Sequence, residues 1–310
     1  MKPGSALAAA IRGIALASGT APALALSFAI TAAIASAAAT PASASLHAAL
    51  DRLPGAASLA TTRGTPFFFH LSLARPALAG EEPFGHGTFP GNLLRQEGAL
   101  GGFLALALLN AAFVSVVSGG LAARFASDRG RGNLPAFASD ALRFAPASLL
   151  LGALSLSLLL GLYHLLVTLP ERLLAEMSLR YEWEAVLPRV FGGILFLLAG
   201  ALVRSVLLAT RGAMALSGRP NPLPALGTGL GLVVRRPGTA LLLEALFALA
   251  AILPPALWLA FAPTLPGWQG NLLDLLGQQG ALFLALASRA AHLGALQTLA
   301  RGSAALRSPV

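Results

Sequence analysis

Few ionisable side chains fall inside the long apolar stretches of this sequence, and those that do are the residues best able to carry chemistry. Glu244 is the one ionisable residue of the apolar stretch 238–261, and Arg204 lies in the preceding stretch, 190–209. Each lies about two helical turns from the basic loop that joins the stretches. On adjacent antiparallel helices the two side chains should share a depth, where an ion pair would offset the cost of burying each charge.

This pair allows two interpretations. In the first, Glu244 is a proton or cation site. In the second, the pair is a structural clasp, and the long Arg204 side chain extends towards the membrane surface.

Three further polar residues belong to the same question. Arg289 and His292 are three residues apart, which places them on one face of a helix. Asn110 lies in the middle of the apolar stretch 101–119 and would meet them inside a bundle. Together with Glu244 and Arg204 they would either line a polar pathway or form hydrogen bonds between helices, each worth less than about 2 kcal/mol.

Other chemistry finds no support in the sequence. The chain has no cysteine, which excludes disulfides, thiolate nucleophiles and thiolate metal ligands. Its histidines and acids show neither the H-E-x-x-H spacing nor an EF-hand, and its glycines form no G-x-G-x-x-G frame. The sequence therefore predicts no catalytic residue, no cofactor and no metal, and we expect a protein that is not an enzyme.

The composition is typical of a membrane protein. Of 310 residues, 56% are apolar and only 11% are charged, and the mean hydropathy is +0.76. Soluble domains carry about 25% charged residues. Six apolar stretches are long enough to cross a bilayer as helices. They lie within 1–40, starting near Pro22, at 101–119, 147–166, 190–209 and 238–261, and within 272–300.

These stretches divide the chain into three parts. Residues 1–40 hold a short interfacial segment and the first transmembrane helix, 41–99 form an extracytoplasmic loop, and 100–310 form a five-helix membrane region. Arginines cluster at both ends and after the second and fourth stretches, so the positive-inside rule places both termini in the cytoplasm. The net charge of +9 is spread beside the apolar stretches, which indicates anionic lipid as a partner rather than nucleic acid.

An internal repeat links two of the basic loops. The segments 134–146 and 223–237 both begin Leu-Pro-Ala and both place arginine shortly before a proline that starts an apolar stretch. Each carries an apolar stripe suited to a helix in the headgroup layer. The stripes are Phe137, Ala141 and Phe144 in the first segment, and Leu223, Leu226, Leu230 and Val233 in the second. The repeat predicts three helical hairpins in tandem.

With these features the region from Gly101 to Arg301 resembles uncharacterised six-helix bacterial inner-membrane proteins. It is more distantly similar to the membrane domain fused to some glycerophosphodiester phosphodiesterases. The resemblance depends on the runs Arg143 to Pro146 and Arg235 to Pro237, and on the Gly119-Gly120 pair. It implies a six-helix membrane fold and no known activity or catalytic residue.

The sequence thus predicts an all-α, polytopic membrane protein with six transmembrane helices and interfacial amphipathic helices. We expect a non-enzymatic scaffold, assembly factor or partner subunit of the bacterial inner membrane, with a membrane-protein partner or a second copy of itself. The alternative is a small-solute or ion transporter or channel that uses Glu244, Arg204, Arg289 and His292.

Overall fold

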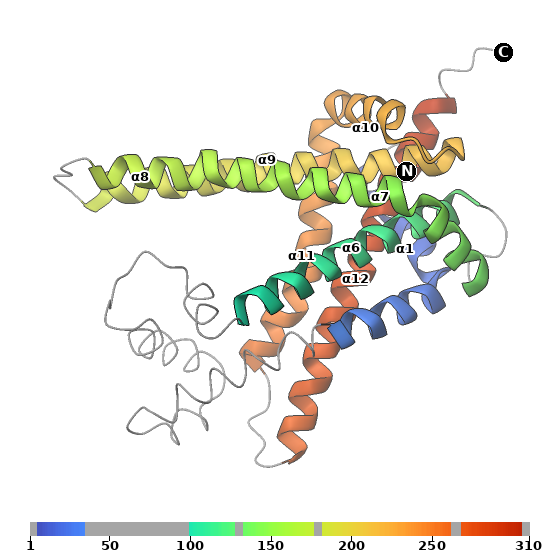
Figure 1. Cartoon of the computed structure of the whole chain (residues 1–310), viewed down its shortest axis with the longest axis horizontal. Helices are drawn as coiled ribbons and strands as arrows, with labels where there is room; N and C mark the ends of the chain where they lie inside the picture. The colour runs from blue at the N-terminus through green and yellow to red at the C-terminus, as the bar shows by residue number, and fades with distance from the viewer. Residues whose placement is uncertain (1–4, 35–98, 128–132, 177–181, 262–267, 306–310) are drawn as a thin grey trace. The chain divides into compact units, whose positions relative to one another are not determined.

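The computed structural model describes residues 5–34, 99–127, 133–176, 182–261 and 268–305. Every regular element in these ranges is a helix, which confirms the predicted all-α class (Figure 1). The predicted extracytoplasmic loop, apart from its last residue, lies outside the described residues.

The chain divides into two compact units. The first contains Met1–Ala25, Ala112–Leu249 and Leu286–Val310, and the second contains Leu26–Ala111 and Ala250–Ala285. Within the second unit, Phe28 and Phe283 pack edge to face, with ring centroids 5.6 Å apart. The site described below belongs to the first unit.

The N-terminal segment forms two short helices. The side chain of Ser5 accepts a hydrogen bond from the backbone N–H of Ala8 and caps α1 (Ala6–Ser18). A second helix, Ala21–Ile34, follows at an angle of 77°. Pro22 lies in its first turn, as the sequence predicts. The bend is the geometry expected where an interfacial helix leads into a membrane span.

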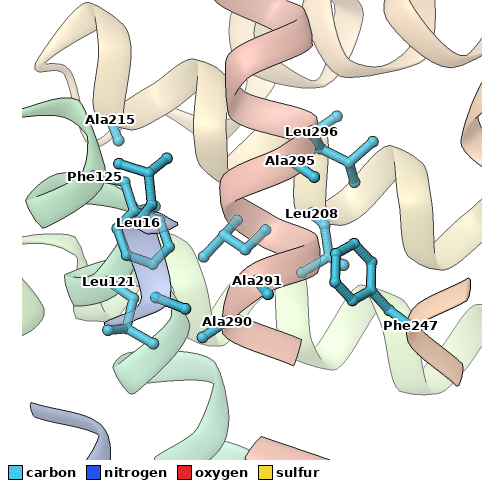
Figure 2. Close-up of a cluster of buried hydrophobic side chains, with 14 of the residues drawn as sticks. Leu16, Leu121, Phe125, Leu208, Ala215, Phe247, Ala290, Ala291, Ala295 and Leu296 are labelled. Carbon is cyan, nitrogen blue, oxygen red and sulfur yellow. The ribbon is translucent and has the colours of Figure 1, made fainter. Parts of the chain in front are cut away.

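The core of the first unit gathers around the C-terminal half of α12 (Trp268–Ala305). Figure 2 shows side chains from α1, from α6 (Ala99–Ala126) and from two later helices meeting α12 there. Small residues allow α1 to pack closely against α12. A Cβ atom on Gly13 would lie 2.7 Å from the backbone nitrogen of Ala295, so only glycine fits at this crossing.

A long antiparallel hairpin forms the middle of the chain. Gly192 packs against the backbone carbonyl of Leu166, and the Tyr163 and Phe196 rings meet edge to face at 5.7 Å. These contacts fix the register of the two arms, which run side by side (Figure 1). The arms are α7 (Leu134–Tyr163), the π-helical turn η1 (His164–Thr168) and α8 (Leu169–Glu176) on one side, and α9 (Glu182–Ser217) on the other.

After α9 the chain folds back on itself. Gly218 has a positive φ of 66°, which glycine adopts without strain, and the short loop leads to α10 (Pro222–Arg235). Arg236 is not helical, and α11 (Pro237–Phe261) starts at the next residue. A residue before proline disfavours helical geometry, so the predicted break before this span is confirmed.

The two copies of the repeat differ in structure. Whereas α10 ends before Pro237, α7 continues through Pro146, so the first copy is no separate interfacial helix. Its stripe is buried against protein rather than facing the headgroup layer. The predicted stripe of α10 is wrong as a single face, because Leu223 and Leu230 are exposed while Val233 is buried. The buried face of α10 instead consists of Ala225, Gly229, Leu232 and Val233, and Gly229 packs closely on α9.

Among the described residues, four helical segments are long and apolar enough to cross a membrane. They are Leu108–Ala126, Leu134–Leu174, Val186–Ser217 and Pro237–Pro254, and they correspond to the predicted second to fifth spans. The bent pair at the N-terminus would make a fifth if it counts as one span. The predicted sixth span lies in α12, which is not among these segments.

Close packing between α9 and α10 yields a direct test. A Cβ atom on Gly229 would lie 2.8 Å from the carbonyl oxygen of Val206, whereas the neighbouring Gly231 has open space. Gly229→Ala should therefore lower the free energy of unfolding by about 1–3 kcal/mol, as overpacking does. The matched Gly231→Ala should be neutral or stabilising by up to about 1 kcal/mol. Thermal unfolding of both variants in one detergent checks this, and equal midpoints would contradict the packing.

Candidate functional site

Glu244 lies at the centre of the polar site. The carboxylate projects from the apolar helix α11, and the residue is only 7% exposed. Its Oε1 atom lies 2.9 Å from Nη1 of Arg204 on α9, which confirms the pairing predicted from their equal depth. The Arg204 side chain is 40% exposed. The pair is therefore asymmetric, with a buried anion met by a cation that reaches it from the surface of the unit.

His292 approaches the other oxygen of the carboxylate. Its Nδ1 atom lies 3.3 Å from Oε2 of Glu244, and its ring stacks on Phe247 with centroids 5.4 Å apart. The residue is fully buried. Neither ring nitrogen, nor Oε2, makes a hydrogen bond of good geometry within the described part of the chain. The contact thus juxtaposes two titratable groups without fixing a proton between them.

Arg289 and His292 do not share one environment, although the sequence predicts a common face. Arg289 is exposed, whereas His292 is fully buried. Residues three apart differ by about 60° around a helix axis, and this rotation is enough to turn His292 into the core while Arg289 stays at its edge. Arg289 still acts electrostatically on both Glu244 and Arg204.

A hydrogen bond next to Arg289 joins α11 and α12. The Ser288 hydroxyl donates to the backbone carbonyl of Phe247 at 2.6 Å. One continuous contact between α11 and α12 thus contains Glu244, Phe247, Ser288 and His292. Arg204 extends this contact to α9.

Asn110 belongs to the second unit. It is partly buried on α6, and its Oδ1 atom accepts no hydrogen bond from a described residue. Its predicted meeting with Arg289 and His292 stays a prediction.

Sequence reasoning missed Arg211. Its place just after an apolar stretch suggested a loop residue, but α9 continues to Ser217 and leaves Arg211 only 8% exposed. Its Nε atom has no hydrogen-bond partner among the described residues. The available signal was spacing, because Arg211 follows Arg204 by seven residues, or two helical turns, on the same side of the helix.

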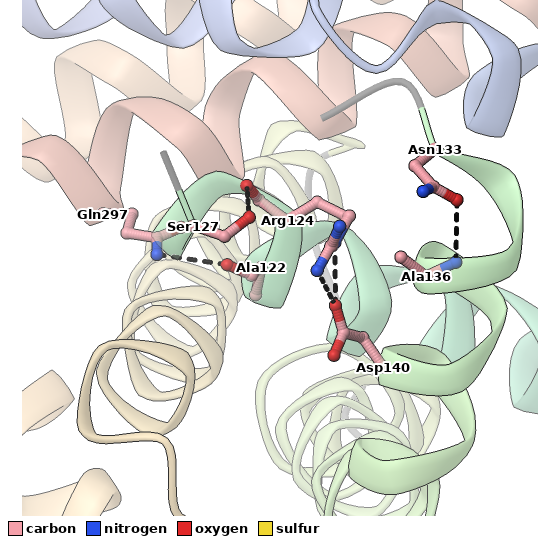
Figure 3. A network of polar contacts seen from close by, with 7 residues as sticks. All are labelled: Ala122, Arg124, Ser127, Asn133, Ala136, Asp140 and Gln297. Carbon is pink, nitrogen blue, oxygen red and sulfur yellow. Dashed lines mark hydrogen bonds and ion pairs between the residues drawn. The ribbon is translucent and has the colours of Figure 1, made fainter. Parts of the chain in front are cut away.

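Gln297 is a further buried polar residue on α12. Its Nε2 donates to the backbone carbonyl of Ala122 at 3.1 Å and so ties α12 to α6 (Figure 3). Gly212 of α9 packs directly on its aliphatic stem. The Oε1 atom remains without a described partner. On α12, buried polar atoms are therefore found at Gln297 as well as at His292, which lies next to Glu244.

Arginines also close the ends of helices. Arg124 near the end of α6 donates from Nε to Asp140 of α7 at 2.7 Å, as Figure 3 shows. Arg143 donates to the carbonyl of Gly218 at 2.6 Å. Arg301 of α12 donates from Nη2 to the carbonyls of Phe125 and Ala126 at the end of α6, a standard way to satisfy terminal carbonyls.

The arrangement can do two things chemically. It can hold α9, α11 and α12 together through one charge pair and its neighbours, and it can pass a proton between a carboxylate and an imidazole. In the described ranges no three histidine or acidic side chains gather as metal ligands.

No known protein family, characterised protein or solved structure shows a significant match to the chain. The resemblance to six-helix inner-membrane proteins therefore stays a prediction.

The asymmetry of the Glu244–Arg204 pair predicts how much stability is lost when its exposed partner is removed. Arg204→Met leaves the buried carboxylate without its cation and should lower the free energy of unfolding by about 1–3 kcal/mol. That is less than for a fully buried pair, because Arg204 is partly exposed to begin with. Arg204→Met combined with Glu244→Leu should be more stable than Arg204→Met alone, since no charge is stranded.

Thermal unfolding midpoints in one detergent measure this difference, with Arg219→Met as the control for loss of an exposed arginine. Equal midpoints for the single and double variants would show that the carboxylate does not depend on Arg204.

Proposed function

We propose that the protein is a non-enzymatic integral membrane protein of the bacterial inner membrane that acts as a scaffold, assembly factor or partner subunit. The observation that carries this proposal is that the intramembrane charge of Glu244 is used to hold helices together. Glu244 is buried and paired with Arg204, and its contacts join α11 to α9 and α12 beside a dense apolar core. Such a contact holds helices in place and needs no substrate.

The long hairpin supports an interaction role. Within the two membrane-span segments Leu134–Leu174 and Val186–Ser217, an apolar stretch of 18 residues has only 6% and 17% of its residues, respectively, buried inside the protein. Large apolar side chains such as Phe191 and Leu197 face outwards. These surfaces suit lipid or the helices of a membrane partner, packed through small residues such as Gly193 that leave open space.

The proposal includes the full topology. Six spans arranged as three hairpins, with both termini in the cytoplasm, place the arginine-rich helix ends on one side of the membrane. The four apolar helical segments and the bent N-terminal pair are compatible with this arrangement.

A second function, as a proton-coupled transporter or channel, is favoured by one observation. His292 is fully buried, its nitrogens have no described hydrogen-bond partner, and it lies 3.3 Å from Glu244. Intramembrane acid and histidine neighbours are the groups that proton relays use. In this case Arg204 would act as the counter-ion that releases the carboxylate when it takes up a proton.

The missing cysteines allow the two functions to be separated. Single cysteines in place of Ala240, Phe247 and Ser288 surround Glu244, and a cysteine in place of the exposed Arg219 marks the loop after α9. A charged thiol reagent reacts only where water reaches the thiol. If the protein is a scaffold, treatment of intact membranes should label position 219 and leave the three inner positions unlabelled. Labelling at the inner positions would reveal an aqueous pathway, and the transporter function would replace the scaffold.

A further inference from the structure

We infer that the junction of α1 and α12 is a binding site for the phosphate headgroup of an anionic phospholipid. This site is separate from the Glu244 contact and does not depend on whether the protein is a scaffold or a transporter. It is an open pocket of about 350 Å³, lined by Arg12, Ala15, Leu16, Thr298, Arg301 and Gly302.

The charge of the pocket selects an anion. Two arginines line it, and none of its lining residues among the described ranges is a carboxylate. Among the described residues, Arg12 has no hydrogen-bond or ion-pair partner for its five N–H donors. Arg301 donates from Nη2 to the carbonyls of Phe125 and Ala126, and its Nη1 and Nε atoms have no partner among the described residues. A planar guanidinium with several free N–H groups matches the oxygens of a phosphate.

The anchoring of Arg301 makes the site preorganised. Its two hydrogen bonds hold the guanidinium at the end of α6, so little side-chain freedom remains to be lost when an anion binds. Thr298 contributes shape rather than a donor, because its hydroxyl donates to the carbonyl of Ala295 at 2.7 Å.

The surroundings indicate that the anion is the headgroup of a lipid rather than free phosphate. On α1 the residues Leu7, Ile11 and Ile14 form a stripe that is more than half exposed, while the opposite face packs on α12. An apolar stripe next to an arginine on a short helix is the pattern of a helix lying in the headgroup layer. Acyl chains can cover the stripe while the phosphate reaches the two arginines. A second pocket is lined by the carboxylate of Asp140 as well as by arginines, so its charge is less favourable for an anion.

The site is tested by lipid binding to the purified full chain in detergent, measured by native mass spectrometry. Phosphatidylglycerol should bind the protein at least about 5-fold more tightly than phosphatidylcholine, whose headgroup carries no net charge. Arg12→Gln should weaken phosphatidylglycerol binding about 5-fold, the contribution of one arginine at an anionic surface. Arg12 is exposed and has no hydrogen-bond or ion-pair partner among the described residues, so this variant should keep the thermal stability of the parent. The matched Arg219→Gln, an exposed arginine outside the pocket, should bind as the parent does.

Two results would overturn the inference. Equal phosphatidylglycerol binding by the parent and Arg12→Gln would show that the pocket is not the site. Displacement of the lipid by millimolar inorganic phosphate would show that the occupant is a free anion. Arg301→Gln should also weaken lipid binding, but it should in addition lower the unfolding midpoint, because the α6 carbonyls lose their donor.

Discussion

The structure depends on how one carboxylate is tolerated in an apolar helix. An isolated charge costs several kcal/mol to bury, so Glu244 has to be neutralised or paired wherever α11 packs. Arg204 supplies the charge from α9, and His292 and Phe247 enclose the other side. Because the partners come from different helices, satisfying the carboxylate also fixes which helices are neighbours. The surrounding core of leucine, alanine and phenylalanine is non-directional and would not by itself specify that choice.

The arginines form a second system with a different role. Arg301 and Arg143 donate to the terminal carbonyls of other elements, and Arg124 pairs with Asp140 across two helices. Each combines positive charge with several donors, which suits the negative ends of helices. These three arginines thus have structural roles that need no nucleic acid. Arg12 has no such partner among the described residues, and it lines the pocket that we propose binds a lipid phosphate.

The sequence predicts features that follow from the length of a helix and from the depth of a residue along it. It misses features that depend on how a helix is rotated and on which helices pack beside it. The helical rise alone places Glu244 and Arg204 at one level, and proline preference places the start of the second helix. The burial of His292, the exposure of Arg289 and the buried face of α10 depend on which helices pack beside them. Helix ends were also missed, since α9 extends past the apolar stretch and encloses Arg211, and α7 continues through Pro146. Proline within a helix is tolerated in membranes because neighbouring groups satisfy the freed backbone.

The central claim is that Glu244 is an ionised carboxylate held by Arg204 in a dry contact between helices. Infrared spectroscopy of the protein in lipid nanodiscs tests it most directly, with Glu244→Gln used to assign the carboxyl signal. The account predicts a carboxylate band from Glu244 at neutral pH that is converted to a protonated carboxyl band in Arg204→Met. A protonated Glu244 in the parent protein would contradict the ion pair, and would instead favour a proton site shared with His292.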